Sequence, residues 1–322
     1  MAVAHPTARQ AKIAVTGSTG FIGSHLVPAL LANRFRVMAI AKQGLDTGRE
    51  GLETFASDIR SGEGLNDAFA GVEAVIHLAA RCHIFRETDS DPLAAYRVVN
   101  VKGTSNVAQA ASAVGARLFV HVSSIAAMGG GSEAIQDECS PCSPETPYGT
   151  SKLESEAVVR AVSAETGMRV VILRLPMAYG PSDKGNLPRL IRWAERGLPC
   201  LVFRPENMRS MIYVENVVAG ILAVLNDVRE ESATYILKDR EDCSSRTLFA
   251  AICRELNRQP VFLPIPSPLV RLGGMLSDDF RKLTGSFRVS AAKAEREIGF
   301  ISPFSLEEGI ARTVRWYRNS VR

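Results

Sequence analysis

Apolar residues in the first 180 positions follow two different spacings along the chain. Short runs rich in β-branched residues, typical of strands buried on both faces, lie at 12–16, 36–40, 74–79, 117–123 and 169–175. Longer segments with apolar residues at helical intervals lie at 21–32, 92–113 and 148–166. Because strands that alternate with helices are joined by right-handed crossovers, this order predicts an α/β fold with a doubly wound parallel sheet.

The spacing changes after Gly180-Pro181. The elements predicted beyond this point are a helix over 187–196, a strand-to-helix unit over 212–227 and short helices over 241–322. The two expected domains are 1–180 together with 209–240, and 181–208 together with 241–322. The first would hold the main sheet, to which 209–240 returns, and the second would be a smaller, mainly helical lobe.

A glycine-rich loop joins the first strand-like run to the first helix-like segment. Gly17, Gly20 and Gly23 follow a Gly-x-x-Gly-x-x-Gly spacing, which differs by one residue from the commoner Gly-x-Gly-x-x-Gly. Gly17 would permit a tight turn, Gly20 would let the backbone approach a pyrophosphate, and Gly23 would let the helix pack closely on the strand. A lone glycine triplet is often only a turn. Its position between a strand and a helix, whose N-terminal N–H groups can bind phosphate, predicts a dinucleotide-binding loop.

Tyr148 and Lys152 are four residues apart in a helix-like segment, so their side chains project from one helical face. A free phenol has a pKa of about 10 and is a poor base at neutral pH. The neighbouring ammonium is expected to lower the pKa of Tyr148 and make it an acid/base for a hydroxyl or carbonyl proton. The spacing alone is a weak signal, because most such pairs are a solvated helix face.

Two serines, Ser123 and Ser124, end the apolar run that contains Phe119. Ligands of open parallel sheets bind beyond the carboxyl ends of the strands. Ser124 is therefore expected to hydrogen-bond a substrate oxygen beside Tyr148. The alternative is that the serines only terminate the strand as turn residues, and this alternative fits Ser123 better than Ser124.

Together these motifs resemble the extended short-chain dehydrogenase/reductases, the enzymes of the NAD-dependent epimerase/dehydratase type. The resemblance extends from about residue 11 to the C-terminus and includes Leu78-Ala-Ala80, Asn100-Val-Lys-Gly-Thr104 and Arg174–Pro181. It implies a Rossmann fold in which 1–180 binds the dinucleotide and the smaller lobe binds the substrate. It also implies that Ser124, Tyr148 and Lys152 are catalytic.

Three further stretches are similar to bacterial nucleotide-sugar enzymes of O-antigen, lipopolysaccharide and capsule synthesis. They are Lys184–Arg192, Arg209–Val217 and Ser305–Gly309. Such enzymes include 4-reductases of UDP-4-keto-6-deoxy-N-acetylhexosamines and the more distant UDP-glucose 4-epimerases. The resemblance implies a nucleotide-sugar substrate and a homodimer.

The resemblance also implies two sets of binding residues. The cofactor set is Gly17, Thr19, Gly20, Phe21, Ile22, Gly23, Lys42, Asp58, Ile59, Leu78, Ala79, Ala80, Asn100, Ser123, Tyr148, Lys152 and Pro176. The substrate set is Ser124, Asn186, Arg209 and Arg281. Arg209 would bind the substrate pyrophosphate, since a planar guanidinium matches phosphate oxygens. Arg281, or Lys282 in its place, would add a second phosphate contact. The equal alternative is that both residues are solvated charges on a helix.

The choice of nicotinamide cofactor depends on the residues that follow the second strand-like run. A carboxylate there would accept hydrogen bonds from the ribose of NAD, but this chain has Ala41 and Lys42. Lys42, with Arg60 as a second cation, favours NADP(H) over NAD(H). The alternative is a solvated lysine, because isolated surface pairs are weak. Asp58 would lie beside the adenine, or would simply be a turn residue at a strand end.

Composition narrows the remaining possibilities. The 322 residues are 46% hydrophobic and carry a net charge of +4, with no basic run of the kind that nucleic acid requires. No apolar run reaches the ~18 residues of a membrane span, and residues 1–11 lack the apolar core of a signal peptide. Cys139 and Cys142 have metal-like spacing but no second Cys/His pair nearby. We expect a cytoplasmic protein with reduced thiols, no metal, no nucleic-acid partner and no membrane insertion.

Three functions fit these features. The first is NAD(P)H-dependent reduction of the 4-keto group of a UDP-linked deoxy-amino sugar, with hydride from nicotinamide and a proton from Tyr148. The second is a UDP-sugar 4-epimerase with tightly bound NAD; the absent carboxylate favours a reductase, which exchanges its cofactor at every turnover. The third is a nonenzymatic dinucleotide-binding regulator, because fold does not fix function. The presence of Ser124, Tyr148 and Lys152 together argues against a regulator, which needs none of them.

Overall fold

The computed structural model describes residues 11–43, 48–82, 89–130, 134–183, 185–203, 207–265 and 286–320. The chain forms two compact units. The first consists of Met1–Ala127, Thr146–Leu173 and Asn226–Thr234. The second consists of Met128–Glu145, Arg174–Leu225 and Tyr235–Arg322. The domains expected from the sequence are defined by binding, one of the dinucleotide and one of the substrate. The two units are defined by packing alone, so the expected domain boundaries remain a prediction.

A seven-stranded sheet organises the first unit, in the order β10-β6-β5-β4-β1-β2-β3. Its strands are β1 (Lys12–Thr16), β2 (Arg36–Ala41), β3 (Leu52–Ala56), β4 (Ala74–His77), β5 (Leu118–Ser124), β6 (Arg169–Leu175) and β10 (Ala233–Ile236). Strands β3, β2, β1, β4 and β5 pair in parallel, with Thr16 in register with both Ile40 and His77. The predicted Rossmann-type α/β fold is confirmed. The chain reverses its direction of winding between β1 and β4, and ligands of such sheets bind at that point.

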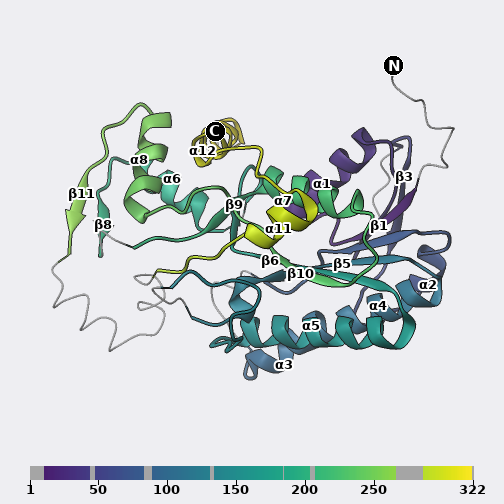
Figure 1. Cartoon of the computed structure of the whole chain (residues 1–322). Helices are drawn as coiled ribbons and strands as arrows, with labels where there is room; N and C mark the ends of the chain where they lie inside the picture. The colour runs from purple at the N-terminus through teal and green to yellow at the C-terminus, as the bar shows by residue number, and fades with distance from the viewer. Residues whose placement is uncertain are drawn as a thin grey trace, which may run out of the picture. The chain divides into compact units, whose positions relative to one another are not determined.

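Helices cover both faces of this sheet. They are α1 (Phe21–Ala32), α2 (Leu65–Ala68), α3 (Pro92–Arg97), the π-helix η1 (Val98–Gly103), α4 (Thr104–Ala113), the 3-10 turn η2 (Ile125–Ala127) and α5 (Pro147–Thr166). In Figure 1, α1 lies on one side of the strands, and α4 and α5 lie on the other. The segment predicted as one helix over 92–113 is divided by η1, whose buried residues are Asn100 and Gly103, so hydrophobic spacing does not reveal it.

The second unit contains two small sheets and five described helices. The pairs are β7 (Met177–Tyr179) with β9 (Met211–Tyr213), and β8 (Cys200–Val202) with β11 (Phe262–Pro264). The helices are α6 (Leu187–Glu195), α7 (Val214–Leu225), α8 (Ser245–Glu255), α11 (Ala292–Ile298) and α12 (Leu306–Ser320). In the segment 209–240, which was expected to return to the main sheet, β10 joins that sheet. β9 belongs to the same segment but pairs with β7 in a small sheet.

Tyr179, the last residue of β7, belongs to the core of the second unit. Its side chain is fully buried, and its hydroxyl donates to Asp239 at 2.9 Å. The same carboxylate accepts hydrogen bonds from the Tyr213 N–H and the Asn216 amide. Three donors therefore compensate the burial of Asp239.

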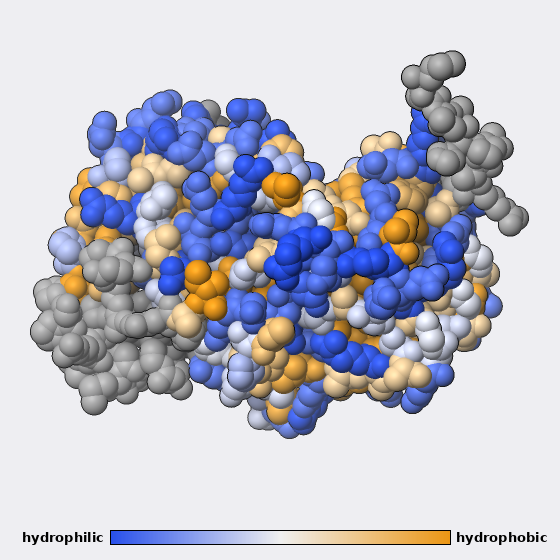
Figure 2. Space-filling view, viewed as in Figure 1, coloured by the Kyte–Doolittle hydropathy of each residue, from blue (hydrophilic) through white to orange (hydrophobic). Residues whose placement is uncertain are grey.

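The surface shown in Figure 2 is mixed in character, with apolar residues in small groups among polar ones. Single exposed apolar side chains are normal on soluble domains. Within the described ranges, no helix has both the length and the apolar character needed to cross a bilayer.

Candidate functional site

The glycine loop follows β1 and leads directly into α1. Gly17 has a φ of 70°, a backbone conformation that favours glycine, and its carbonyl accepts a hydrogen bond from the Gly20 N–H at 2.9 Å. A Cβ added at Gly23 would lie 2.3 Å from the Gly17 oxygen, so the loop and the helix pack backbone against backbone. These are the close approaches that the Gly-x-x-Gly-x-x-Gly spacing predicted.

The first turn of α1 offers its N–H groups to a ligand. The helix begins after Gly20 with no side-chain cap and no acidic residue in its first turn. Uncapped N–H groups and the positive end of the helix dipole favour an anion. Thr19 and Gly20 are exposed, and Phe21 and Ile22 are half-buried. The loop therefore fits the pyrophosphate of a dinucleotide.

The segment after β4 lies against this loop. A Cβ at Gly17 would lie 2.7 Å from the nitrogen of Ala79, whose N–H donates to the Thr16 hydroxyl at 3.4 Å. Leu78, Ala79 and Ala80, predicted from the resemblance to contact the cofactor, are thus placed beside the glycines. Ile59, predicted for the same role, is 6% exposed and belongs to the hydrophobic core.

Two buried histidines support this edge of the sheet. His77 lies between the hydroxyls of Thr16 and Thr104, at 2.7 Å and 2.9 Å, and stacks on the His121 ring. Burial lowers the pKa of His77 to about 3 and holds the pKa of His121 well below its usual value. Both rings are therefore neutral near pH 7 and belong to the core.

The start of α5 places Tyr148 beside the end of β5. The Thr146 side chain caps the helix by accepting a hydrogen bond from the Gly149 N–H at 3.0 Å, and Pro147 occupies the first turn. A Cβ at Gly149 would lie 2.2 Å from the carbonyl oxygen of Ala126, so the helix start packs tightly on η2. Because η2 follows Ser124 directly, this contact brings the Ser124 hydroxyl to the phenol of Tyr148, with which it forms a hydrogen bond.

Lys152 is buried one turn further along the same helix. Its side chain is 3% exposed, and its Nζ donates to the carbonyl oxygen of Val122 at 2.7 Å. Burial lowers the pKa of Lys152 to about 8, against an opposing effect of the Glu156 carboxylate. Lys152 is therefore still mainly an ammonium at neutral pH. Ser124, Tyr148 and Lys152, inferred from separate motifs, lie together in the first unit.

One expectation about Tyr148 is wrong for this structure. Its pKa was expected to fall below that of a free phenol because of Lys152, but burial raises the pKa instead. The hydrogen bond with Ser124 opposes this rise without cancelling it. Desolvation of the phenolate is the largest effect on Tyr148, and the Lys152 ammonium is bound to the Val122 carbonyl instead. Tyr148 thus holds its proton at neutral pH.

Asn100 connects the segment after β4 to α5. Its side-chain oxygen accepts from the Arg81 N–H at 2.7 Å, and its amide donates to the Ser151 hydroxyl at 3.0 Å. Ser151 in turn donates to the carbonyl oxygen of Tyr148 at 2.8 Å. Asn100 is 1% exposed. In this structure it holds the segment after β4 and the start of α5 in register.

The charged residues beyond β2 and β3 converge on one carboxylate. Arg60 donates to both oxygens of Asp58, and the Nζ of Lys42 lies 3.9 Å from the same group. Hydrogen bonds from Arg60 are the main reason why the pKa of Asp58 is lowered to about 2. Lys42 is 70% exposed, so it remains accessible to a ligand. Asp58 is therefore part of an ion-pair cluster and more than a turn residue.

Three further predicted residues belong to the second unit: Pro176, Asn186 and Arg209. Asn186 is exposed at the start of α6, and Pro176 is buried between β6 and β7. The Arg209 backbone pairs with Cys243 and Phe287, and burial lowers the pKa of its guanidinium. Arg281 and its alternative Lys282 lie outside the described residues.

Several residues around the catalytic helix were not identified from the sequence. The Tyr96 ring meets the Tyr148 ring edge-on, with centroids 5.9 Å apart, and the thiol of Cys82 interacts electrostatically with Tyr148 and Lys152. Neither has a local motif that could have revealed it. Glu156 does have a local signal in the sequence, because it is four residues after Lys152 and shares its helical face.

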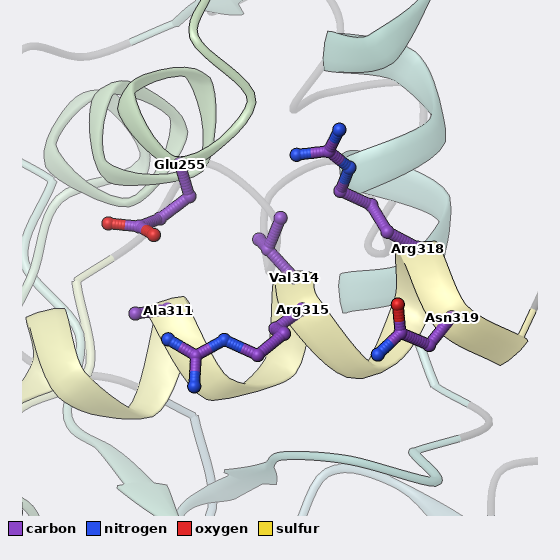
Figure 3. Close-up of a pocket in the computed structure, with 6 residues that line it drawn as sticks. All are labelled: Glu255, Ala311, Val314, Arg315, Arg318 and Asn319. Carbon is purple, nitrogen blue, oxygen red and sulfur yellow. The ribbon is translucent and has the colours of Figure 1, made fainter.

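A hollow of about 570 Å³ in the second unit contains none of the predicted site residues. It is lined by Glu255, Ala311, Val314, Arg315, Arg318 and Asn319. Figure 3 shows Glu255 on α8 and the other five on α12, with Arg315 and Arg318 extending in different directions. These two guanidinium groups therefore do not converge on one ligand position.

Comparison with known proteins gives consistent similarities over nearly the whole chain. Residues 13–237 match the model of the NAD dependent epimerase/dehydratase family. The chain is 30% identical over 313 residues to the UDP-glucose 4-epimerase of Vibrio cholerae, covering 94% of each chain. It is 29% identical over 320 residues to the N-acetyl-alpha-D-glucosaminyl-diphospho-ditrans,octacis-undecaprenol 4-epimerase of Escherichia coli O157:H7, with the same coverage. The solved structure of MoeE5 in complex with UDP-glucuronic acid and NAD has a TM-score of 0.80 at 25% identity, covering 96% of this chain and 99% of that one.

Proposed function

Since the chain belongs to the NAD-dependent epimerase/dehydratase family, we propose that it is a reductase of the 4-keto group of a UDP-linked deoxy-amino sugar. The family establishes an enzyme of the epimerase/dehydratase type, and the proposal specifies the direction of the reaction and its substrate. It includes a cytoplasmic homodimer that supplies sugar precursors of O-antigen or lipopolysaccharide.

The protonation state of Tyr148 carries this proposal. A 4-keto group that receives a hydride becomes an alkoxide and needs a proton at the same time. A phenol with the ordinary pKa of about 10 already holds its proton at neutral pH, and burial raises the pKa of Tyr148 further. A phenol that keeps its proton is ready to protonate the alkoxide, whereas oxidation of a sugar hydroxyl requires phenolate first.

The other catalytic groups have roles that follow from their positions. The bound nicotinamide supplies the hydride. Ser124, hydrogen-bonded to Tyr148, would donate to the same substrate oxygen, and this bond strengthens as negative charge develops. The Lys152 ammonium, held by Val122, would supply positive charge on the helical face of Tyr148 and would bind the nicotinamide ribose. Arg209 would bind the substrate pyrophosphate, with Asn186 as a further contact.

Two assays test the reaction directly. Nicotinamide absorbance is followed with NADPH and with NADH against a panel of 4-keto nucleotide sugars, and we expect consumption of the reduced cofactor with at least one UDP-linked 4-keto sugar. The purified protein is also tested for bound nicotinamide. If it carries stoichiometric NAD and interconverts UDP-sugars without added cofactor, the reductase proposal is wrong.

A second candidate is a UDP-sugar 4-epimerase with tightly bound NAD. It is favoured by the two relatives described above, the 4-epimerases of Vibrio cholerae and Escherichia coli O157:H7, at 30% and 29% identity. The same three residues would serve it, with Tyr148 first accepting and then returning the proton of the 4-hydroxyl. The two assays above separate this function from the reductase.

We also propose that NADP(H) is preferred over NAD(H), on the basis of Lys42. Its ammonium is exposed beside Asp58 and Arg60, in the position after β2 where a carboxylate would repel a 2′-phosphate. The structure of MoeE5 contains NAD, so the preference must be measured for this chain.

Lys42→Glu is expected to reduce the preference for NADPH by about tenfold, because it replaces an attractive charge with a repulsive one near the 2′-phosphate. The measurement is the ratio of kcat/KM for NADPH and NADH at low and high salt, and added salt should reduce the difference. Arg117→Glu makes the same charge change at a side chain that is 84% exposed at the start of β5, and it should leave the ratio unchanged. An unchanged ratio in Lys42→Glu would mean that Lys42 is a solvated lysine.

A further inference from the structure

A buried carboxylate lies on the same face of α5 as Tyr148 and Lys152. Glu156 follows Lys152 by four residues and is 1% exposed. Its Oε1 accepts a hydrogen bond from the Ser123 hydroxyl at 2.7 Å, and its Oε2 lies 3.4 Å from the Arg160 guanidinium. A buried carboxylate is costly unless it is paired and hydrogen-bonded, so this position requires both partners.

Three consecutive residues at the end of β5 each bind one residue of this helical face. The Val122 carbonyl accepts from Lys152, the Ser123 hydroxyl donates to Glu156, and the Ser124 hydroxyl bonds to Tyr148. Tyr148, Lys152 and Glu156 are spaced by one helical turn each, and their partners follow one another along the strand. The Glu156 contact is therefore one of three that fix α5 against the catalytic edge of the sheet.

We propose that Glu156 is a positioning residue that keeps Lys152 charged and directed toward Val122 and Tyr148. This inference rests on the proposed function, in which the Lys152 ammonium acts beside the phenol. Ser123 orients the carboxylate from the strand, and Arg160 holds it from the next turn of the helix, where it also donates to Thr234 at 2.8 Å. The carboxylate then supplies negative charge one helical turn from an ammonium that is removed from water.

The surrounding groups leave Glu156 as the main source of this charge. His77 on β4 and His121 on β5 are neutral above pH 6, because burial lowers the pKa of each. Burial raises the pKa of the Cys82 thiol, so it too is uncharged near neutral pH. On α5 itself, Tyr148 is a phenol, and Arg160 is a cation that pairs with Glu156.

The effect on Lys152 has a definite sign. Burial lowers its pKa to about 8, and the Glu156 carboxylate is the largest of the opposing effects. Removing the negative charge would therefore lower the pKa further, and the ammonium would be lost at a lower pH. An enzyme that needs this ammonium would lose activity on the alkaline side first.

Glu156→Gln tests this with nearly the same side-chain size. In the enzyme saturated with NADPH, we expect the alkaline limb of kcat/KM to move about one pH unit lower, since a nearby opposite charge shifts a pKa by about that much or more. This corresponds to an about fivefold loss at pH 8 and almost none at pH 6. Glu156→Asp keeps the charge on a shorter side chain. Its alkaline limb should lie at a pH between those of Glu156→Gln and the unmodified enzyme.

Glu154→Gln is the matched control. It removes the same charge from the same helix, but Glu154 is partly exposed and pairs with Arg97 at 2.5 Å. Its pH profile should coincide with that of the unmodified enzyme. A general loss of helix stability would affect both variants and would lower activity at every pH rather than move one limb.

A measurement that does not depend on turnover separates this inference from the proposed function. The Lys152 side-chain amine is titrated by NMR in lysine-labelled protein, with the signal assigned from Lys152→Arg. We expect its pKa to be about one unit lower in Glu156→Gln and intermediate in Glu156→Asp. If the pKa of Lys152 is the same in the unmodified protein and in a folded Glu156 variant, the inference is wrong, whichever reaction the enzyme catalyses. If only the 4-keto sugar assay fails, the function is wrong and Glu156 keeps its role.

Discussion

Tyr148→Phe is expected to lower kcat by about 10²–10⁴-fold, because it removes the group that transfers the proton and nothing else. The ring remains, so its edge-on contact with Tyr96 and the start of α5 should be preserved. KM for the cofactor and the thermal unfolding midpoint should stay close to those of the unmodified enzyme. Stopped-flow and steady-state assays with NADPH and the 4-keto substrate measure the loss.

Tyr96→Phe provides the comparison, since it removes a hydroxyl from the neighbouring ring and leaves Tyr148 intact. It should retain most of the activity. If Tyr148→Phe turned over at the rate of the unmodified enzyme, both the reductase and the epimerase would be excluded, because each requires a proton at this position.

Gly23→Ala is expected to be the most damaging change outside the catalytic residues. A Cβ there would lie 2.3 Å from the Gly17 oxygen and 2.7 Å from backbone atoms of Ser18, so no side-chain rotation can relieve the clash. Either α1 moves away from β1 or the loop is deformed, at a cost of about 3 kcal/mol or more. We expect a lower urea midpoint and at least an about tenfold weaker NADPH affinity, measured by fluorescence titration.

Ser24→Ala is the control for this prediction. Ser24 is the next residue of α1, its side chain is exposed, and its hydroxyl only donates to the Phe21 carbonyl. The variant should bind NADPH normally and unfold at nearly the same urea concentration. Normal cofactor binding by Gly23→Ala would show that the dinucleotide does not depend on this loop.

Much of the first unit could be predicted from local patterns. Each strand-like run is a strand, and the helix predicted at 21–32 has those boundaries in the structure. The glycine loop and the start of α5 were also recognisable, because their requirements are local: a turn with positive φ at Gly17, and a threonine cap with a proline in the first turn. The π-turn at Asn100 was not predicted, since its hydrogen bonds to Arg81 and Ser151 join distant parts of the chain.

By itself the chain determined which chemical groups are present and the face of the helix they share, because a four-residue spacing on an α-helix and a glycine's freedom at positive φ are local properties. Tertiary structure decided how those groups behave. The phenol of Tyr148 was expected to ionise more easily beside Lys152, yet burial of the phenol raises its pKa. Desolvation and partner choice depend on atoms far away in sequence, so only the folded protein could determine that the pKa of Tyr148 rises rather than falls and that Ser123 binds the Glu156 carboxylate.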